Sequence, residues 1–395
     1  MPNKEKEKLV PNLRFKGFTD DWIQYKLQDI ANRVTRKNEK QVANIPLTIS
    51  DKFGLIDQRE YFTKKIASKN MSHYILLKKG EFAYNKSYSK RNLFGTIARL
   101  DNYDMGALST LYIAFEVENA DSTFIQKYYE SDKWHYGISK IANEGARNHG
   151  LLNISTQDFF NTRIKIPYNL DEQTKIGITL EKLDKIITLE QEKNDHIKLI
   201  KKSILQNIFT EKEKGFTSLR FNSFNENWVE RKLGDLLKYE QPTKYIVKTA
   251  EYSDKYDIPV LTAGKTFLLG YTNETTGIYD KGEVILFDDF TTATQFVDFK
   301  FKVKSSAMKL LTPIDNNDIN FLFEVLNVIQ YPHEDHKRYW ISEFSTLKIM
   351  IPKSKKEQQQ IGSLLKQIDI IMKKSQSKIN MYLRIKASLL DTLFV

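Results

Sequence analysis

The chain has 395 residues, with 61 Lys and Arg against 50 Asp and Glu, and a formal net charge of +11. This length allows about two or three domains, and the positive balance favours an acidic partner such as nucleic acid. The absence of cysteine excludes disulfide scaffolds, cysteine nucleophiles and thiolate metal sites. Because neither a signal-peptide core nor a run of about 18 apolar residues occurs, we expect an unprocessed cytoplasmic protein with no membrane partner.

The chain opens with a charged arm, 1–12, and then enters a pattern that occurs twice. The motif Leu-Arg-Phe-x-x-Phe-x-x-x-Trp-x-x-x-Lys-Leu-x-Asp starts at Leu13 and again, 206 positions later, at Leu219. A Lys-Gly-Glu turn before an apolar run occurs at Lys79 and at Lys281. The repetition predicts one scaffold used twice, with a different variable surface in each copy.

The first α/β domain, 13–166, is predicted to carry a DNA-facing surface. It holds 24 Lys and Arg against 17 Asp and Glu, and eight of these cations lie between Tyr61 and Arg91, beside one carboxylate. Cations bind phosphates, and Asn and Arg can read base edges; for any single residue, a solvated basic face is equally compatible. The candidate contacts are Arg36, Lys37, Asn85, Lys86, Tyr88, Lys90, Arg91 and Arg147.

A spacer helix, 167–210, is predicted to follow, because a block reading Ile-Pro and then Glu-Gln-x-x-Ile-Gly starts at Ile166 and returns 185 positions later at Ile351. Steps of four and three residues give seven apolar positions of ten in the first helix and eight of ten in the second. This is coiled-coil spacing, in which polar seam residues set register and partner choice. The helix and partner residues are predicted to be Glu172, Gln173, Ile176, Leu180, Leu183, Ile187, Ile197, Lys201, Glu357, Gln358, Ile361, Leu365, Ile368, Met372, Tyr382 and Lys386.

A charged linker, 211–218, leads to the second α/β domain, 219–351. Its run from Phe299 to Lys304 alternates apolar and basic residues, which on a strand would put the lysines on the outer face as a phosphate track. The candidate DNA contacts of this domain are Lys300, Lys302, Lys304, Lys337 and Arg338.

The second spacer helix, 352–395, is expected to pack on the first in antiparallel orientation. The alternative is that each helix packs only on its own domain. The charged stretch after Phe209 matches the one that opens the chain, so the pattern is circular. It predicts that Val395 lies near the N-terminal arm of a pseudo-two-fold molecule.

Signals for catalysis and metal binding are weak. Ala263-Gly-Lys-Thr lacks the first glycine of a phosphate-binding loop, and His333 and His336 have the wrong spacing for a zinc helix. No Pro-Asp dipeptide and no Asn- or Asp-Pro-Pro-aromatic motif occurs. We therefore expect no catalytic residue, no metal site and no cofactor in this chain.

Two variable domains, each followed by a long helix that opens with Ile-Pro and Glu-Gln-x-x-Ile-Gly, resemble the specificity subunit of Type I restriction-modification systems. The resemblance covers nearly the whole chain. It implies an α+β fold, with two pseudo-repeated α/β target-recognition domains joined by two long antiparallel coiled-coil helices. Each domain would read one half of an asymmetric, bipartite DNA site.

The same resemblance implies the partners. They would be double-stranded DNA, two methylation subunits docked on the helices, and two restriction subunits. In that family the methylation subunits use S-adenosylmethionine to methylate adenine N6, and the restriction subunits use ATP and Mg. The helices would fix the number of unread base pairs between the half-sites. Two alternatives stay open, namely a general nucleic-acid-binding adaptor with a coiled-coil docking spacer, and an enzyme with an unrecognised active site.

Overall fold

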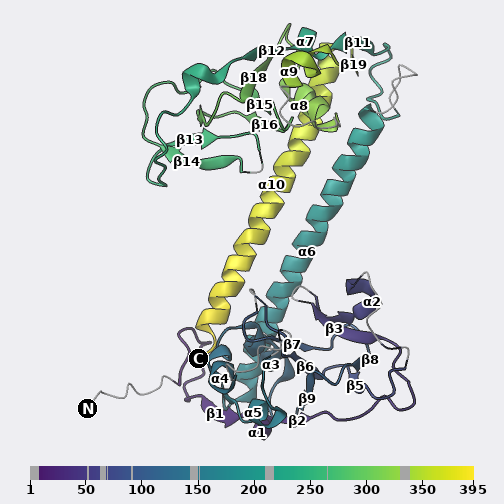
Figure 1. Ribbon diagram of the computed structural model, residues 1–395, viewed down its shortest axis with the longest axis vertical. Helices are drawn as coiled ribbons and strands as arrows, with labels where there is room; N and C mark the ends of the chain where they lie inside the picture. The colour runs from purple at the N-terminus through teal and green to yellow at the C-terminus, as the bar shows by residue number, and fades with distance from the viewer. Residues whose placement is uncertain are drawn as a thin grey trace. The chain divides into compact units, whose positions relative to one another are not determined.

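The chain folds into two compact units. Unit 1 comprises Met1–Glu190 together with Lys378–Val395, and unit 2 comprises Gln191–Ser377. Each unit holds one α/β domain and about half of each of two long helices (Figure 1). The computed structural model describes residues 9–50, 53–62, 68, 70–89, 92–142, 150, 152–209, 218–264, 266–329 and 339–395.

The α/β domain of unit 1 contains two four-stranded sheets and a two-stranded antiparallel ribbon. The sheet orders are β2-β9-β6-β7 and β4-β3-β8-β5, with β3 and β8 parallel, and the ribbon pairs β1 with β10. The strands are β1 (Ile23–Lys26), β2 (Ala31–Arg33), β3 (Pro46–Ser50), β4 (Gly54–Asp57), β5 (Ile75–Lys78), β6 (Phe82–Asn85), β7 (Thr96–Arg99), β8 (Met105–Leu108), β9 (Ile113–Val117) and β10 (Arg163–Ile166). The short helices are α1 (Leu27–Ile30), α2 (Gln58–Tyr61), α3 (Ser122–Glu130), α4 (His135–Ile141) and α5 (Thr156–Phe160).

The α/β domain of unit 2 repeats this plan. Its sheets have the orders β12-β18-β15-β16 and β14-β13-β17, with β13 and β17 parallel, and its ribbon pairs β11 with β19. The strands are β11 (Val229–Lys232), β12 (Leu237–Glu240), β13 (Ile258–Leu261), β14 (Leu268–Thr272), β15 (Val284–Asp288), β16 (Thr294–Val297), β17 (Lys302–Val303), β18 (Met308–Pro313) and β19 (Lys348–Ile351). The helices are α7 (Leu233–Leu236), α8 (Ile319–Val328), α9 (Tyr339–Ser342) and the 3₁₀ turns η1 (Pro242–Tyr245) and η2 (Phe344–Thr346).

The two domains thus share one topology, although their variable segments have little sequence in common. In the part of the chain that is described, β5 extends the second sheet of unit 1 by one strand. The backbone conformation explains why glycine is repeated in the Lys-Gly-Glu turn. Gly80 and Gly282 both have φ of 88°, a left-handed conformation that favours glycine. Each turn feeds a buried central strand, β6 or β15, as predicted from the sequence.

The two long helices are α6 (Leu170–Phe209) and α10 (Lys355–Thr392). Each begins three residues after the start predicted from the sequence. Every seam position from Ile176 to Ile208 and from Ile361 to Leu393 is buried or partly buried. The four-and-three spacing therefore identified the inner surface of the helix pair.

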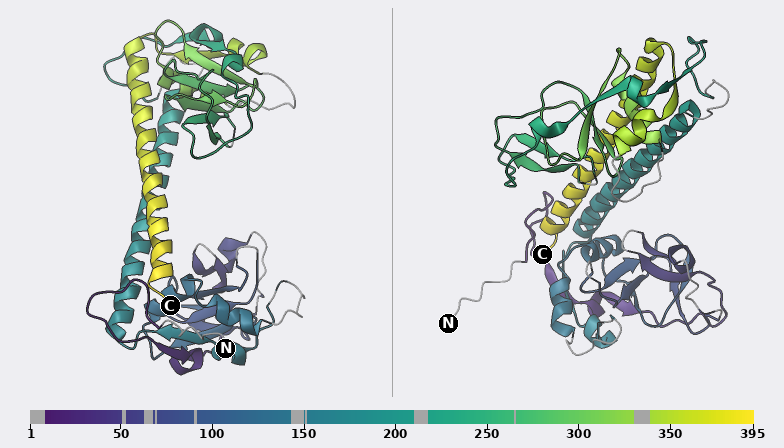
Figure 2. Two further views of the ribbon diagram at one scale, coloured as in Figure 1. Left: turned by 90° about the vertical axis from the view of Figure 1, so that its left-hand side faces the viewer. Right: turned by 45° about the horizontal axis from the view of Figure 1, so that its top comes forward.

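The helix halves run antiparallel within each unit (Figure 2). In unit 1, Lys386 Nζ lies 2.6 Å from an oxygen of Asp184, while Lys378 pairs with the later residue Glu190. In unit 2, Lys201 pairs with Asp369 at 2.7 Å, and the Nδ2 of Asn194 donates to Gln376 Oε1 at 3.3 Å. Residue numbers in these pairs rise along one helix as they fall along the other, so the antiparallel arrangement is confirmed. The same pairs exclude the alternative in which each helix packs only on its own domain.

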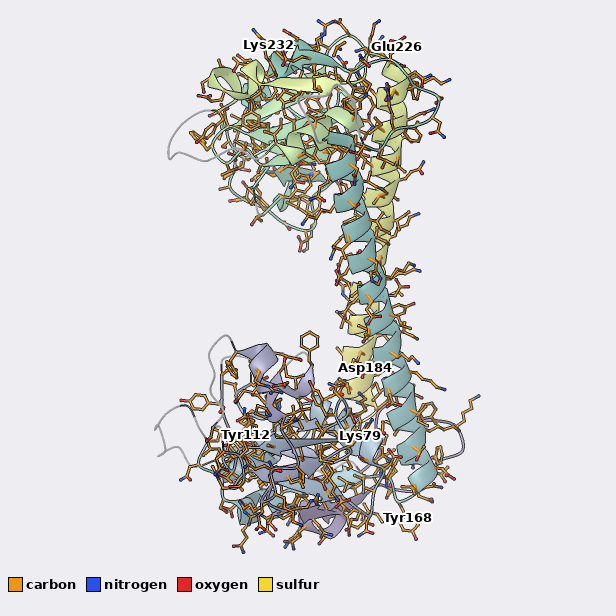
Figure 3. The ribbon with its side chains drawn as sticks, turned by 90° about the vertical axis from the view of Figure 1, so that its right-hand side faces the viewer. Lys79, Tyr112, Tyr168, Asp184, Glu226 and Lys232 are labelled. Carbon is orange, nitrogen blue, oxygen red and sulfur yellow. The ribbon has the colours of Figure 1, made fainter. Side chains whose placement is uncertain are left out.

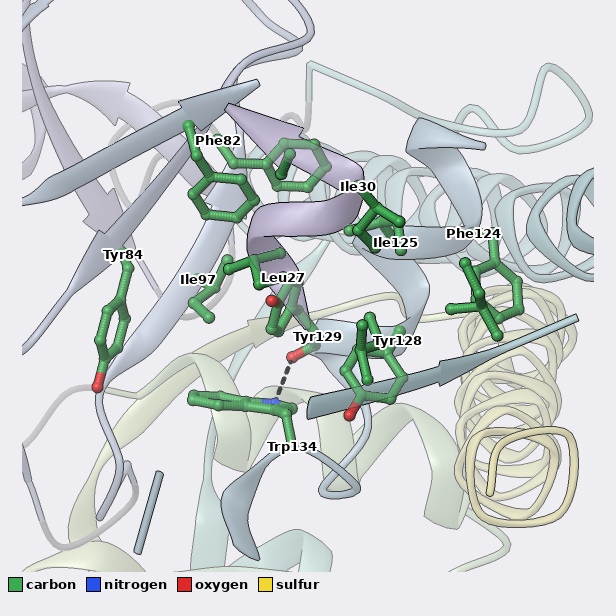
Figure 4. Packing of buried hydrophobic residues seen from close by; sticks show 14 of the residues in the cluster. Leu27, Ile30, Phe82, Tyr84, Ile97, Phe124, Ile125, Tyr128, Tyr129 and Trp134 are labelled. Atoms are coloured by element: carbon green, nitrogen blue, oxygen red, sulfur yellow. Dashed lines mark hydrogen bonds between the residues drawn. The ribbon is translucent and has the colours of Figure 1, made fainter. Parts of the chain in front are cut away.

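Aromatic side chains fill the core of unit 1 between the β2-β9-β6-β7 sheet and the helices (Figure 4). Trp134 donates its indole N–H to the carbonyl of Tyr129 at 3.1 Å, which satisfies a buried donor. Phe124 and Tyr128 of α3 pack on Phe394. In unit 2 the equivalent phenylalanine, Phe209, packs on Trp228 and Phe321.

The end of each long helix joins the start of a domain in the same way. The backbone N–H of Leu13 donates to the carbonyl of Thr392 at 2.9 Å, and that of Leu219 donates to Asn207 at 3.2 Å. The two donors are related by the repeat of 206 positions and the two acceptors by the repeat of 185 positions, so the two bonds are equivalent. Val395 and Phe15 both pack against the unit 1 core, whereas residues 1–8 of the N-terminal arm lie outside the described residues, so the proximity of Val395 to the arm stays a prediction.

No helix within the described residues is long and apolar enough to cross a membrane.

A circular permutant tests this closure. Joining Val395 to Lys4 and opening the chain within 211–217 keeps every contact named above, so we expect a folded protein whose melting temperature stays within about 5 °C of that of the original chain. Thermal unfolding followed by circular dichroism measures this. A control opened between Leu180 and Leu183 cuts a buried helix and should not fold, whereas an unfolded permutant would contradict the circular arrangement.

Candidate DNA interface and helix anchors

A basic edge in unit 1 joins two segments that lie about 40 residues apart in the sequence. The segment at Arg36 and Lys37 runs beside β5, where the N–H of Leu76 donates to the carbonyl of Arg36 at 2.8 Å. Lys78 and Lys79 lie at the end of that strand, and Lys79 is labelled in Figure 3. We call Arg36, Lys37, Lys78 and Lys79 the basic edge.

One buried carboxylate organises the basic edge. Glu81 accepts from the Arg36 guanidinium at 2.5 Å and from the backbone N–H of Lys78 at 2.7 Å. Arg36 is therefore tied down, while the amines of the exposed Lys78 and Lys79 project outward. Lys37 is also exposed, and its Nζ reaches the carbonyl of His73 at 3.2 Å. These lysines place positive charge at the surface without any fixed base-reading geometry.

The remaining candidates of the first domain divide into three groups. Asn85 accepts from the N–H of Ser87 at 3.0 Å, and Lys86 donates to the carbonyl of Ile154 at 3.3 Å, so both side chains brace their own domain. Tyr88 is exposed. The other predicted contacts, in both domains, lie outside the described residues: Lys90, Arg91, Arg147, Lys337 and Arg338.

The predicted outward orientation of Lys302 is wrong. The regular strand β17 covers only Lys302 and Val303, so the alternation from Phe299 to Lys304 does not describe one pleated strand. Lys302 is 1% exposed and its Nζ lies 2.9 Å from Glu274, whereas Phe299 is 46% exposed. Lys300 and Lys304 do reach the surface, where Lys300 pairs with Asp280 and Lys304 donates to Tyr252.

The ion pair of Lys302 is an internal support. Lys302 also donates to the carbonyls of Thr276 and Gly277, at 2.6 and 3.1 Å. Burial would raise the pKa of Glu274, but hydrogen bonds from Lys302 and from the backbone N–H groups of Thr249 and Lys248 outweigh it and hold that pKa at about 2. Lys302 therefore fixes a loop and is not available to phosphate.

The Glu-Gln pair at each helix start forms what we call a helix anchor. Arg14 donates to both oxygens of Glu172, at 2.7 and 2.8 Å, and Arg220 donates to both oxygens of Glu357, at 2.7 and 2.9 Å. Both carboxylates are 1% exposed. Each hydrogen bond raises the pKa of its arginine. Bidentate, charge-assisted pairs of this kind fix the relative orientation of the two side chains and also stabilise the fold.

The glutamine of each pair ties the long helix to a domain helix. Gln173 donates to the carbonyl of Pro167 at 2.8 Å and accepts from the N–H of Asp121, also at 2.8 Å. Asp121 in turn caps α3 by accepting from Phe124 N. In unit 2, Gln358 makes the same two contacts with Pro352 and Asp318, at 3.0 and 3.3 Å.

The glycine of the same motif permits this contact. A Cβ at Gly177 would lie 2.9 Å from Phe124 N, and one at Gly362 would lie 2.8 Å from Phe321 N. The first turn of the domain helix therefore rests directly on the long helix. Glu172, Gln173, Glu357 and Gln358 were predicted as helix-start and partner residues; the structure shows that all four are buried in anchors within their own units.

The seam lysines form a second contact between each domain and the helices, which we call a seam cluster. In unit 1, Lys386 contacts Glu130 at 2.7 Å and Asp184 at 2.6 Å, and Lys127 contacts the same two carboxylates; Asp184 is labelled on α6 in Figure 3. In unit 2, Lys201 contacts Glu324 at 2.8 Å and Asp369 at 2.7 Å. Burial lowers the pKa of Lys386, as it does that of Lys201, but the carboxylates raise both by a larger amount.

The outer faces of α6 and α10 carry apolar residues that the seam does not use. By the antiparallel register, Ile186 lies level with Ile385 in unit 1, and Ile200 lies level with Ile371 in unit 2. The repeat of 185 positions relates Ile186 to Ile371 and Ile200 to Ile385, and each is between 41% and 55% exposed. We call Ile186, Ile200, Ile371 and Ile385 the outer isoleucines. Clustered exposed apolar residues mark interaction surfaces.

The described residues contain no group of three or more His, Asp or Glu side chains placed to hold a metal ion.

Residues 225–381 match the family model for the Type I restriction modification DNA specificity domain. A stretch of 126 residues is 58% identical to the Type I restriction enzyme EcoR124I/EcoR124II specificity subunit of Escherichia coli. Residues 225–381 therefore carry a DNA specificity domain of the Type I restriction-modification family. The match to the E. coli protein covers 30% of this chain and 31% of the relative, so it spans about a third of the relative's length.

One solved specificity subunit has the same fold. The S subunit of a Type I restriction-modification system from M. genitalium superposes with a TM-score of 0.71 at 14% identity, over 98% of this chain and 99% of that one. The HsdS subunit from Thermoanaerobacter tengcongensis has a TM-score of 0.41 at 16% identity, over 94% and 96% of the two chains. The first match supports the α+β arrangement of two domains and two long helices.

Two single-lysine variants test whether Lys302 stabilises the fold while Lys300 only adds charge to the surface. Lys302→Gln leaves Glu274 without its buried cation, so we expect the free energy of unfolding to fall by about 3 kcal/mol in urea titrations. The matched variant Lys300→Gln removes an exposed pair and should change stability by less than about 0.5 kcal/mol. Equal stability of the two variants would contradict the internal role of Lys302.

Proposed function

We propose that this chain is the DNA-reading subunit of a Type I restriction-modification complex. Each α/β domain reads one half of an asymmetric, bipartite site on double-stranded DNA. The observation that carries the proposal is the pair of matching helix anchors, which hold two domains of one topology but unlike surface on a shared pair of helices. A frame repeated in this way suits two different recognition surfaces, and the basic edge gives the first of them charge for phosphate contacts.

The outer isoleucines are the proposed docking sites for methylation subunits. Since the sequence repeat relates Ile186 to Ile371 and Ile200 to Ile385, the two sites are equivalent, which favours two methylation subunits. Two restriction subunits would join through them. S-adenosylmethionine, ATP and Mg would be bound by those partners, and this chain would supply no catalytic residue.

The continuous helices α6 and α10 would set the spacing between the half-sites. Each helix takes part in the packing of both units, which supports this proposal. At about 1.5 Å per helical residue and about 3.4 Å per base pair, seven residues correspond to about three base pairs.

Methylation mapping tests the function directly. The chain is expressed with its methylation subunit in a host that lacks adenine methylation, and modified bases are located by long-read sequencing. We expect one bipartite motif with a fixed spacer. Random DNA binding by the chain, with no methylated motif and no bound methylation subunit, would favour a general nucleic-acid-binding adaptor instead. Cleavage or modification of DNA by the purified chain alone would favour an enzyme.

Removing one heptad from each helix tests the spacing role. Deleting residues 189–195 and the opposing 375–381 preserves the phase of both seams, so the helices can still pair. We expect the unread spacer to shorten by about three base pairs, or methylation to be lost if the altered rotation prevents binding. Normal methylation of an unchanged motif would refute the spacing role.

Substitutions at the outer isoleucines test docking. Ile186→Lys together with Ile371→Lys introduces charge at two equivalent exposed positions, so we expect at least a tenfold weaker association with the methylation subunit in a co-purification titration. Thr188→Ala with Lys373→Ala, also related by 185 positions, exposed and about 200° round each helix from the isoleucines, is the matched control and should bind normally. Unchanged binding by the isoleucine variant would place the docking surface elsewhere.

A further inference from the structure

The two seam clusters share their helix residues but differ in what the domain contributes. Lys386 and Asp184 of unit 1 correspond to Lys201 and Asp369 of unit 2 through the repeat of 185 positions. The domain helices α3 and α8 align at their capping aspartates, Asp121 and Asp318. By that alignment Lys127 corresponds to Glu324, and Glu130 corresponds to Asn327. A cation of the first domain is therefore replaced by a carboxylate in the second.

This replacement unbalances the charge in unit 2. The cluster of unit 1 holds two ammonium groups and two carboxylates, all within 2.7 Å contacts. The cluster of unit 2 holds the single ammonium of Lys201 between two carboxylates, Glu324 and Asp369. A buried charge is costly unless it is paired, and here one cation faces two anions.

Glu324 is the carboxyl group of this cluster that is most affected by the excess of negative charge. Its side chain is 3% exposed, and its Oε2 is buried without a hydrogen-bond donor among the described residues. Asp369 of α10 lies within hydrogen-bonding reach of it. Burial, opposed by Lys201 and reinforced by Asp369, raises the pKa of Glu324 to about 7.

Other charged groups around α8 are occupied elsewhere. Lys366 of α10 pairs with Glu283, which precedes β15, and Lys309 of β18 pairs with Asp289. Asp318 caps the start of α8. The groups that face Glu324 most directly are thus Lys201 from α6 and Asp369 from α10.

We propose that Glu324 binds and releases a proton, and that this proton joins α8 to the two long helices as part of the attachment of the second recognition domain. The proton sits on the unpartnered Oε2, from which the O–H donates to Asp369 while Lys201 donates to both carboxyl groups. When the proton leaves to solvent, α8 is held by one lysine against two carboxylates. Unit 1, with its four balanced charges, keeps its attachment across the same pH range.

The direction of the pH effect follows from the raised pKa. Below about pH 4.5 the carboxyl group is neutral whether α8 is packed or open. Between about 4.5 and 7 the open form ionises while the packed form keeps its proton, so packing weakens as pH rises through this window. Above about 7 both forms are ionised and the effect levels off.

Hydrogen–deuterium exchange of the full-length chain tests the proposal, with rates corrected for the intrinsic pH dependence of exchange. In the original chain, opening of α8 should increase between pH 5 and 7 relative to opening of α3. Glu324→Gln is neutral at every pH and still accepts from Lys201, so it should remove this dependence. At pH 8 the variant should exchange at least about tenfold more slowly in α8 than the original chain, and at pH 5 equally.

Two further variants test whether the charge balance of a seam cluster decides the pH dependence of its domain helix. Lys127→Gln leaves Lys386 with two carboxylates, so α3 should acquire a pH dependence, smaller than that of α8 because Glu130 is 29% exposed. Glu324→Lys with Asn327→Glu rebuilds the balanced cluster in unit 2 and should abolish the dependence there. A Glu at 327 keeps an acceptor for the hydroxyl of Thr294, which now donates to Asn327.

The proposal is overturned if Glu324→Gln lowers the protection of α8 at pH 8, fails to fold, or retains the pH dependence of the original chain. It is also overturned if Lys127→Gln leaves α3 insensitive to pH.

Discussion

The bidentate pairing of a partly buried arginine with the first, buried glutamate of each long helix is the contact on which the architecture depends. Arg14 with Glu172, and Arg220 with Glu357, each bring the start of a domain to the start of a helix. The glutamines next in sequence extend the contact to the capping residues of α3 and α8. These contacts specify the charges, the hydrogen-bond directions and a close approach of the two backbones. Each domain therefore packs on its helix in a single orientation.

The anchors and seam clusters together separate what is repeated from what varies. Repeated residues lie where a domain meets the helices, and the variable segments form the sheets and loops away from that contact. Shared strand order in the two domains shows that the variable sequence is still confined to one topology. The exception lies at Lys127 and Glu324, where a variable residue enters a repeated contact and changes its charge balance.

Residue spacing predicted the helices well and the surfaces poorly. Coiled-coil spacing is local, so Ile176 to Ile208 could be assigned to a buried seam from the sequence. Lys302 could not be placed, because its burial depends on Glu274 and on a strand that ends after two residues. The anchors left a signal that sequence reasoning missed. Arg14 and Arg220 lie in one repeated block and Glu172 and Glu357 in another, and opposite charges repeated in this way indicate a pair.

The composition of unit 1 has a consequence for the order of folding. Unit 2 is one continuous segment, Gln191–Ser377, whereas unit 1 needs Lys378–Val395 to complete it. Those residues are synthesised after all of unit 2, and they include Phe394, which packs on Phe124 and Tyr128. During synthesis the first domain therefore emerges early but keeps an uncovered aromatic surface until Phe394, just after the end of α10, leaves the ribosome. The second domain to be translated is therefore the first that can finish folding, and residues 378–395 complete the first domain.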